Sequence, residues 1–157
     1  MSGKIEIEKI SQIYLNKMSK KTKVGIIQLK ITKNKEFNLK NSIGNIKEAA
    51  RKGAKIICMP ELFLTEYFCK VENHSYFKIA EKVPGSTSDI FCKLAKELNV
   101  ILIISLFEKK LSGIYYNTCI TVNNNGKIIS KYRKMHIPDD PGSVSYTHLR
   151  AHETLEN

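Results

Sequence analysis

The sequence predicts an α/β protein with a mixed sheet, and three observations support this fold class. First, three short apolar runs are rich in β-branched residues, as buried strands are. They span residues 24–29, 55–59 and 100–107. Second, two segments with helical periodicity separate these runs, and third, a hairpin signal follows them. Because crossovers between parallel strands are right-handed, this β-α-β-α-β order predicts three parallel strands, to which the hairpin adds antiparallel ones.

The first helical segment shows one apolar stripe, because Leu39, Ile43, Ile46 and Ala50 recur at intervals of 4, 3 and 4 residues. Gly53 is then expected just beyond the helix end, at the position that favours a left-handed residue.

The second helical segment follows a turn at Pro84 and Gly85, and the spacing of Ser86 and Asp89 resembles a capping box. Apolar residues then recur at helical spacing, namely Phe91, Leu94, Ala95 and Leu98. The strand at 100–107 is apolar on both faces, which predicts a place in the interior of the sheet. Residues 123–126, Asn-Asn-Asn-Gly, form the predicted turn between strands at 114–122 and 127–132.

Composition is that of a soluble globular protein, with 42% apolar and 26% charged residues in 157. The longest apolar run, 100–107, is interrupted by Ser105 and is far shorter than a membrane span. Lysines without a following apolar segment at the N-terminus do not form a secretory signal. We therefore expect a cytoplasmic protein with no membrane partner.

A net charge of +11 raises the question of nucleic-acid binding. Of the 26 basic residues 23 are Lys, and they are scattered from Lys4 to Lys134 without a dense block. Few aromatic residues lie among them to stack on bases. We therefore expect no nucleic-acid partner.

The four cysteines, Cys58, Cys69, Cys92 and Cys119, are widely spaced. None forms a Cys-x-x-Cys pair, and no histidines flank them at the spacing of zinc ligands. Cys58 in an apolar strand and Cys92 in an amphipathic helix are expected to be buried, inert thiols. No metal or cofactor is implied.

Three segments differ in character. Residues 1–22 are a Lys-rich extension, either a short helix or, if Met18 is the true start, partly upstream translation. Residues 23–142 carry the alternating strands and helices. The preceding 142 residues hold 23 Lys and 21 Ile, whereas residues 143–157 hold neither. The last segment is therefore expected to be a non-native tail, with an ordinary polar tail as the alternative.

Glu61 directly follows the second predicted strand, and the ends of such strands are the usual place for catalytic groups. Flanked by Pro60, Leu62 and Phe63, its carboxylate can be partly desolvated, which would raise its pKa and suit a general base. Taken alone, a solvated loop glutamate is the more common case.

Lys134 closes the second strand of the hairpin, where a lysine can stabilise an oxyanion or hold a carboxylate. It is also one lysine among 23. His136 is a candidate acid or base, or else a residue that shapes the loop before Pro138. Asp139 and Asp140 have the pattern of a turn.

Four motifs, in this order and spacing, resemble the nitrilase (carbon–nitrogen hydrolase) superfamily. They are Val-Gly-Ile-Ile-Gln at 24–28, Pro-Glu-Leu-Phe at 60–63, Tyr-Asn-Thr at 116–118 and Tyr-Arg-Lys-Met-His-Ile-Pro at 132–138. The similarity covers residues 23–142, the N-terminal half of that family's domain. It implies part of a four-layer α-β-β-α sandwich, here a truncated one.

The resemblance implies a Glu–Lys–Cys triad, with Glu61 as general base and Lys134 stabilising the oxyanion. The family's nucleophilic Cys lies beyond the lysine, and this sequence holds no Cys after Cys119. A supporting glutamate expected shortly after Gly142 is also absent. The chain as written is therefore expected to be inactive.

Within the superfamily, four segments are most similar to the branch that converts N-carbamoylputrescine to putrescine, ammonia and carbon dioxide in polyamine synthesis. They are residues 61–63, 67–69, 107–108 and 136–142. The implied partners are a small ureido or amide substrate and, for the full-length protein, further copies of itself. Another amide or ureido substrate, or a non-catalytic basic binding module, are the alternatives.

Overall fold

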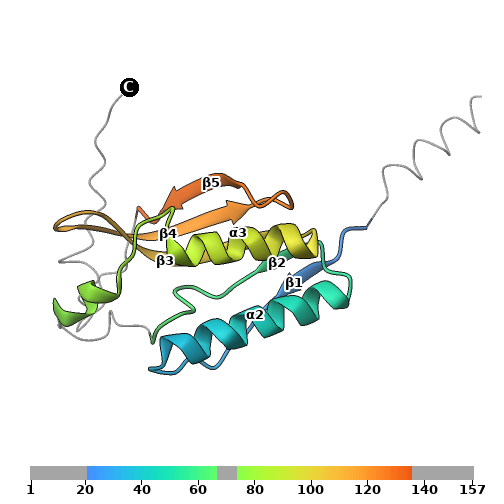
Figure 1. Ribbon diagram of the computed structural model, residues 1–157, viewed down its shortest axis with the longest axis horizontal. Helices are drawn as coiled ribbons and strands as arrows, with labels where there is room; N and C mark the ends of the chain where they lie inside the picture. The colour runs from blue at the N-terminus through green and yellow to red at the C-terminus, as the bar shows by residue number, and fades with distance from the viewer. Residues whose placement is uncertain (1–20, 67–73, 136–157) are drawn as a thin grey trace, which may run out of the picture.

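The computed structural model describes residues 21–66 and 74–135, and these form a five-stranded sheet with two α-helices (Figure 1). The strands are β1 (Val24–Ile26), β2 (Ile56–Cys58), β3 (Ile101–Leu111), β4 (Ile114–Val122) and β5 (Ile128–Arg133). They follow one another across the sheet in sequence order, with β1, β2 and β3 parallel and the β3–β4 and β4–β5 pairs antiparallel. The predicted mixed α/β sheet is confirmed, although β1 and β2 are shorter than their apolar runs.

The α-helices are α2 (Lys35–Arg51) and α3 (Ser86–Leu98), which contact each other and pack on one face of the sheet (Figure 1). Both lie on the same face because each belongs to a right-handed crossover between neighbouring strands that run in order. The core between helices and sheet contains Ile46, Ile57, Phe91, Leu102 and Ile120, all fully buried. Alternate residues of β3 and β4 supply this core, as the period of two in a strand requires.

Helix α2 ends where its sequence predicts. Gly53 lies just beyond it with φ of +90°, in the left-handed region that favours glycine. For α3 the predicted capping box at Ser86 and Asp89 is wrong. The N-cap is Gly85, whose backbone N–H donates to Ser88 Oγ at 2.8 Å. Ser86 is therefore the first helical residue, and only the Ser88 half of a capping box is present, because Gly85 has no side chain.

A short 3-10 helix, η2 (His74–Ile79), was not predicted and lies at the end of the sheet where β3 turns into β4 (Figure 1). Its Phe77 ring lies 4.5 Å from Tyr115 and 6.0 Å from Phe107, between ring centroids. Among the described residues, the sheet face away from the helices is covered only at this end. Val24 and Ile26 of the edge strand, for example, are 54% and 82% exposed. Neither described α-helix has the length and apolarity to span a membrane.

Glu108 is a buried charge, 2% exposed, that joins the three long strands. Arg133 donates two hydrogen bonds to its carboxylate, at 2.9 Å from Nε and 2.8 Å from Nη2. Thr118 Oγ1 donates at 2.6 Å and Lys131 Nζ at 3.1 Å. The Arg133 guanidinium also stacks over the Tyr116 ring at 4.3 Å. One carboxylate on β3 thus fixes β4 and β5 to it, and its lone pairs are satisfied.

Burial by itself raises the pKa of Glu108, but the hydrogen bonds from Arg133, Thr118 and Lys131 and the charge of Lys131 outweigh it. Together they hold the pKa at about 2. Because this pKa is lower in the folded than in the unfolded chain, the charged form stabilises the fold. The contribution is roughly 3 kcal/mol. It is complete above about pH 5 and is lost as the pH falls toward 2.

We therefore predict that Glu108→Gln lowers the free energy of unfolding at pH 7 by roughly 3 kcal/mol, because Arg133 and Lys131 lose their partner charge. The variant should also depend less on pH between 5 and 2. Urea unfolding across that range measures both effects. Glu48→Gln is the matched control, since Arg51 and Lys52 also hold the pKa of Glu48 at about 2, but on the surface. Equal losses in the two variants would contradict the role of burial.

Candidate active site

Glu61 and Lys134 lie next to each other although 73 residues separate them in the sequence. Glu61 follows β2, and Lys134 directly follows the last residue of β5. The ammonium Nζ of Lys134 is 3.0 Å from Oε1 of the Glu61 carboxylate. The sheet therefore brings together the two residues that the sequence singled out.

The backbone at Glu61 is firmly placed. Before it, the N–H of Met59 donates to the Ile103 carbonyl at 2.9 Å, which extends the ladder beyond β2. After it, Leu62 has φ of +48°, a left-handed conformation that is unfavourable for a residue with a side chain. Leu62 is buried against Phe107, and this packing keeps the turn in place. The chain is thus turned sharply at the residue after the carboxylate.

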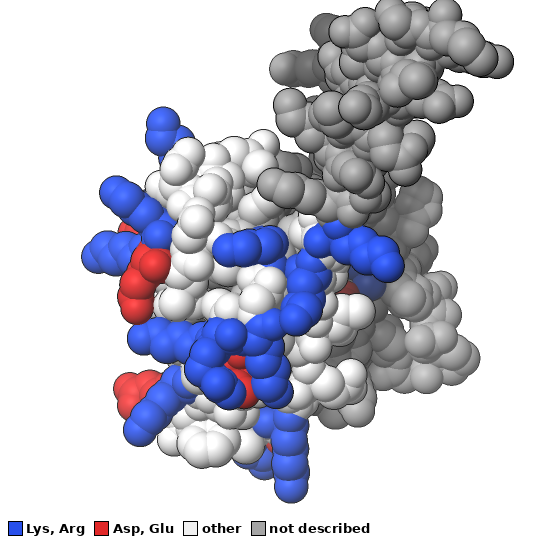
Figure 2. Space-filling model, turned by 90° about the vertical axis from the view of Figure 1, so that its right-hand side faces the viewer, with Lys and Arg blue, Asp and Glu red and all other residues white. Residues whose placement is uncertain are grey.

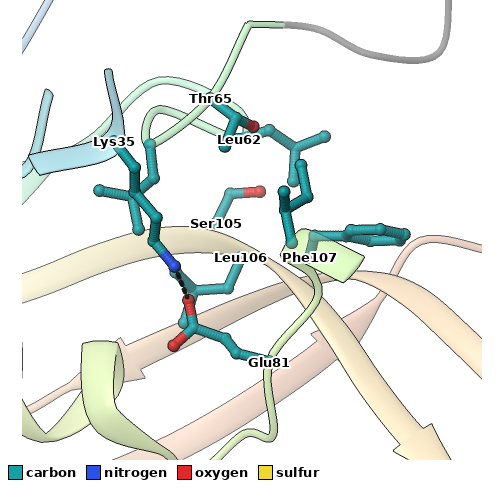
Figure 3. A pocket seen from close by; sticks show the side chains of 9 residues that line it. Lys35, Leu62, Thr65, Glu81, Ser105, Leu106 and Phe107 are labelled. Carbon is teal, nitrogen blue, oxygen red and sulfur yellow. Dashed lines mark hydrogen bonds and ion pairs between the residues drawn. The ribbon is translucent and has the colours of Figure 1, made fainter. Parts of the chain in front are cut away.

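A small pocket lies beside this turn (Figure 3). Leu62 and Phe107 line it on one side, and an ion pair of 3.4 Å between Lys35 and Glu81 lies on the other. Its volume of about 20 Å³ is close to that of a single water molecule. This pocket is too small for a substrate, and its walls support the turn that follows Glu61.

Asn117 of β4 connects Glu61 and Lys134. Its side-chain Nδ2 donates to Glu61 Oε1 at 2.5 Å, and its backbone carbonyl oxygen accepts the backbone N–H of Lys134 at 2.9 Å. Its side-chain Oδ1 accepts from the Ser105 hydroxyl at 3.1 Å. Four residues from four places in the chain thus form one hydrogen-bonded group.

This group lines an open cleft of about 440 Å³ on the sheet face away from the helices. The lining residues are Glu61, Ser105, Asn117, Cys119, Tyr132 and Lys134. Ser105, Cys119 and Tyr132 are direct neighbours across β3, β4 and β5. A row of side chains from three strands therefore forms the floor of the cleft.

The two side chains in the cleft are more exposed to solvent than the sequence predicted. The Glu61 side chain is 47% exposed and that of Lys134 is 32% exposed. The predicted partial desolvation of Glu61 by its neighbours is therefore not provided by the described residues. The Leu62 side chain instead packs against Phe107, and the Phe63 side chain is buried in the core between helices and sheet.

Cys119 is the one cysteine in this cleft among the described residues, which include Cys58, Cys92 and Cys119. Burial raises the pKa of the Cys119 thiol, and the nearby Cys58 raises it further. The thiolate is therefore disfavoured, and a neutral thiol is a poor nucleophile. Cys58 and Cys92 are half-buried rather than fully buried, and burial likewise raises the pKa of Cys92.

Asn117 and Ser105 were not recognised from the sequence as site residues. Both carry a signal: Ser105 is the one polar residue in the run 100–107, and Asn is disfavoured inside strands. His136, Asp139 and Asp140 lie outside the described residues, as do Cys69, the N-terminal extension up to residue 20 and the tail 143–157. Within the described part of the chain, no group of His, Cys, Asp and Glu side chains has the arrangement of a metal site.

Several known proteins are similar to this chain. Omega-amidase NIT2-B of Xenopus laevis is 35% identical over 80% of this chain and 45% of its own length. N-carbamoylputrescine amidase of rice, Oryza sativa subsp. japonica, is 37% identical over 78% of this chain and 40% of its own length. Citrullinase of Francisella tularensis is 38% identical over 76% of this chain and 42% of its own. The chain spans less than half the length of these relatives.

Solved structures with a similar fold also match this chain. A carbon–nitrogen hydrolase from Helicobacter pylori G27 superposes with a TM-score of 0.75 at 28% identity, over 82% of this chain and 44% of its own. Nit3 of Saccharomyces cerevisiae, of the nitrilase superfamily, gives 0.59 at 29% identity, over 73% and 44%. The family model described as carbon-nitrogen hydrolase matches residues 23–154. The motifs, the α/β sheet and these matches together place the chain in the carbon–nitrogen hydrolase family, the nitrilase superfamily.

Proposed function

We propose that the full-length protein containing this chain hydrolyses the C–N bond of a linear amide or ureido group, with Glu61 as general base and Lys134 as oxyanion donor. The observation that supports this most is the 3.0 Å contact between Glu61 and Lys134 at the edge of an open cleft. A carboxylate and an ammonium ion held together beside substrate-sized space can move a proton and stabilise negative charge at adjacent points.

The proposed reaction uses a cysteine from the segment that follows Lys134 in the family. Glu61 takes the thiol proton, and the thiolate sulfur attacks the carbonyl carbon. The carbonyl oxygen becomes an oxyanion, which the Lys134 ammonium stabilises. The oxyanion then re-forms its double bond, the C–N bond breaks, and the nitrogen leaves as ammonia with the proton from Glu61. Glu61 next activates a water molecule, which hydrolyses the thioester and releases the thiol and a carboxylic acid. With a ureido substrate the intermediate is a thiocarbamate, and its hydrolysis gives a carbamic acid, which loses carbon dioxide as its remaining C–N bond breaks and leaves the amine.

We propose N-carbamoylputrescine as the substrate, which would give putrescine, ammonia and carbon dioxide. The rice relative named for this substrate supports it, at 37% identity. Citrulline, named in the Francisella relative, also carries a ureido group. The omega-amidases are similar at about the same level, so a carboxamide substrate is the competing proposal.

The alternative of a basic binding module finds little support in the charge distribution. Figure 2 shows the side of the molecule that lies to the right in Figure 1, where Lys and Arg side chains have Asp and Glu side chains among them. Several lysines of the described chain are paired with carboxylates, as Lys47 is with Glu97 at 3.5 Å and Lys52 with Glu48 at 3.3 Å. Nucleic-acid binders instead gather basic residues along one face.

Glu61→Gln and Lys134→Met in the full-length protein are each predicted to lower kcat by a factor of roughly 10² to 10⁴, because proton transfer and oxyanion stabilisation each contribute about this much. Ammonia release from N-carbamoylputrescine, citrulline and a linear carboxamide measures the rates. Glu66→Gln and Lys110→Met, exposed residues of the same types, are the matched controls. Retention of most activity by Glu61→Gln would rule out its role as the base.

The 157-residue chain by itself is predicted to release no ammonia from these substrates, because it holds no cysteine after Lys134. The same assay tests this with the purified chain and its Glu61→Ala variant side by side. Turnover by the chain above that variant would show that a cysteine within it acts as nucleophile. Cys119 would then be the first to replace, since it lines the cleft.

A further inference from the structure

Asn117 lies on β4 and contacts the side chain of Glu61, which follows β2, and the backbone of Lys134, which follows β5. Its side-chain Nδ2 donates to Glu61 Oε1 at 2.5 Å, and its backbone carbonyl accepts the Lys134 backbone N–H at 2.9 Å. We propose that Asn117 is a positioning residue for the general base, with Ser105 fixing its orientation. This inference rests on the proposed function, in which Glu61 is that base.

The side-chain amide of Asn117 has a donor end and an acceptor end, so it can serve Glu61 in only one of its two orientations. The carboxylate requires the NH₂ end. The Ser105 hydroxyl, at 3.1 Å from Oδ1, donates a hydrogen bond that requires the oxygen end on its own side. Ser105 and Glu61 therefore select the same orientation, and the amide is preset before substrate enters.

The two donors that contact Glu61 meet at the same oxygen. Asn117 Nδ2 and Lys134 Nζ both lie against Oε1, at 2.5 Å and 3.0 Å. From the residues that the structure describes, Oε2 receives no hydrogen bond. Because Oε1 is engaged twice, Oε2 is the oxygen left to accept a proton from the nucleophile. Asn117 thus determines which carboxylate oxygen acts, and it prevents the carboxylate from rotating about its last bond.

If residue 117 served only the packing of the strand, a residue other than Asn would be favoured there. Asn is disfavoured in strand interiors, and its neighbours Tyr116 and Thr118 provide the buried contacts of this part of β4. A β-branched residue at 117 would suit the strand better. Stability and activity should therefore respond differently to Asn117→Val, and this separates positioning from packing.

The test compares steady-state kinetics and thermal unfolding of full-length Asn117→Val with wild type. We expect kcat to fall about 10²-fold, because the base is no longer held in place. KM should change less than about threefold, since Asn117 acts through Glu61 and not through substrate binding. The unfolding temperature should stay the same or rise. Ser105→Ala should lower kcat about tenfold, as expected for loss of one orienting hydrogen bond.

Asn124→Ala is the matched control, because Asn124 Nδ2 makes a similar hydrogen bond to Asn99 Oδ1 at 2.9 Å, on the surface in the turn between β4 and β5. Its kcat should equal that of wild type. A kcat of Asn117→Val within twofold of wild type would overturn the proposal. So would a fall in kcat that is matched by a fall in unfolding temperature.

A second measurement does not depend on catalysis. In ¹H–¹⁵N spectra of the full-length protein, Glu61→Ala should shift the side-chain amide signals of Asn117 and leave those of Asn124 in place. Unshifted Asn117 signals would overturn the contact itself. If instead the signals shift but the wild-type full-length protein hydrolyses no amide or ureido compound, the proposed function fails, and the catalytic part of this inference fails with it.

Discussion

The buried carboxylate of Glu108 binds β3, β4 and β5 together, and the position of the site depends on it. It accepts hydrogen bonds from Thr118, Lys131 and Arg133 on the helix-covered face of the sheet. Lys134 directly follows Arg133, so the contact between Arg133 and Glu108 that fixes the end of β5 also fixes the backbone position of Lys134. A buried charge with this many partners tolerates little change in register, because any shift leaves charges unpaired in a dry environment.

The alternation of side chains along the strands places the support and the chemistry on opposite faces. Thr118 turns toward the helices and Glu108, while its neighbour Asn117 turns toward Glu61. Glu61 reaches the same place from β2, through a turn that the buried Leu62 holds in a left-handed conformation. The two proposed catalytic groups are thus set by separate means, one by the register of the hairpin and one by a packed turn. Their meeting at 3.0 Å requires both.

Much of this fold follows from local patterns in the sequence. Apolar runs and helical stripes indicated the strands and helices, and right-handed crossovers then determined the parallel order. The helix cap at Gly85 and Ser88 was missed because Ser86, two residues before Ser88, offers the same hydroxyl side chain. The roles of Asn117 and Ser105 were missed for a different reason. Their contacts join residues 56 and 12 positions apart, and no periodicity in the sequence encodes such pairs. The exposure of Glu61 was also misjudged, since flanking apolar residues turned away from it into the core.

The most direct test of this account is a crystal structure of the full-length protein with a slow ureido or amide substrate bound. The account predicts that the substrate carbonyl oxygen lies within hydrogen-bond distance of Lys134 Nζ. It also predicts that the thiol of the attacking cysteine lies next to Oε2 of Glu61, with Asn117 on Oε1. A substrate bound away from this cleft, or a thiol whose nearest base is a residue other than Glu61, would contradict it.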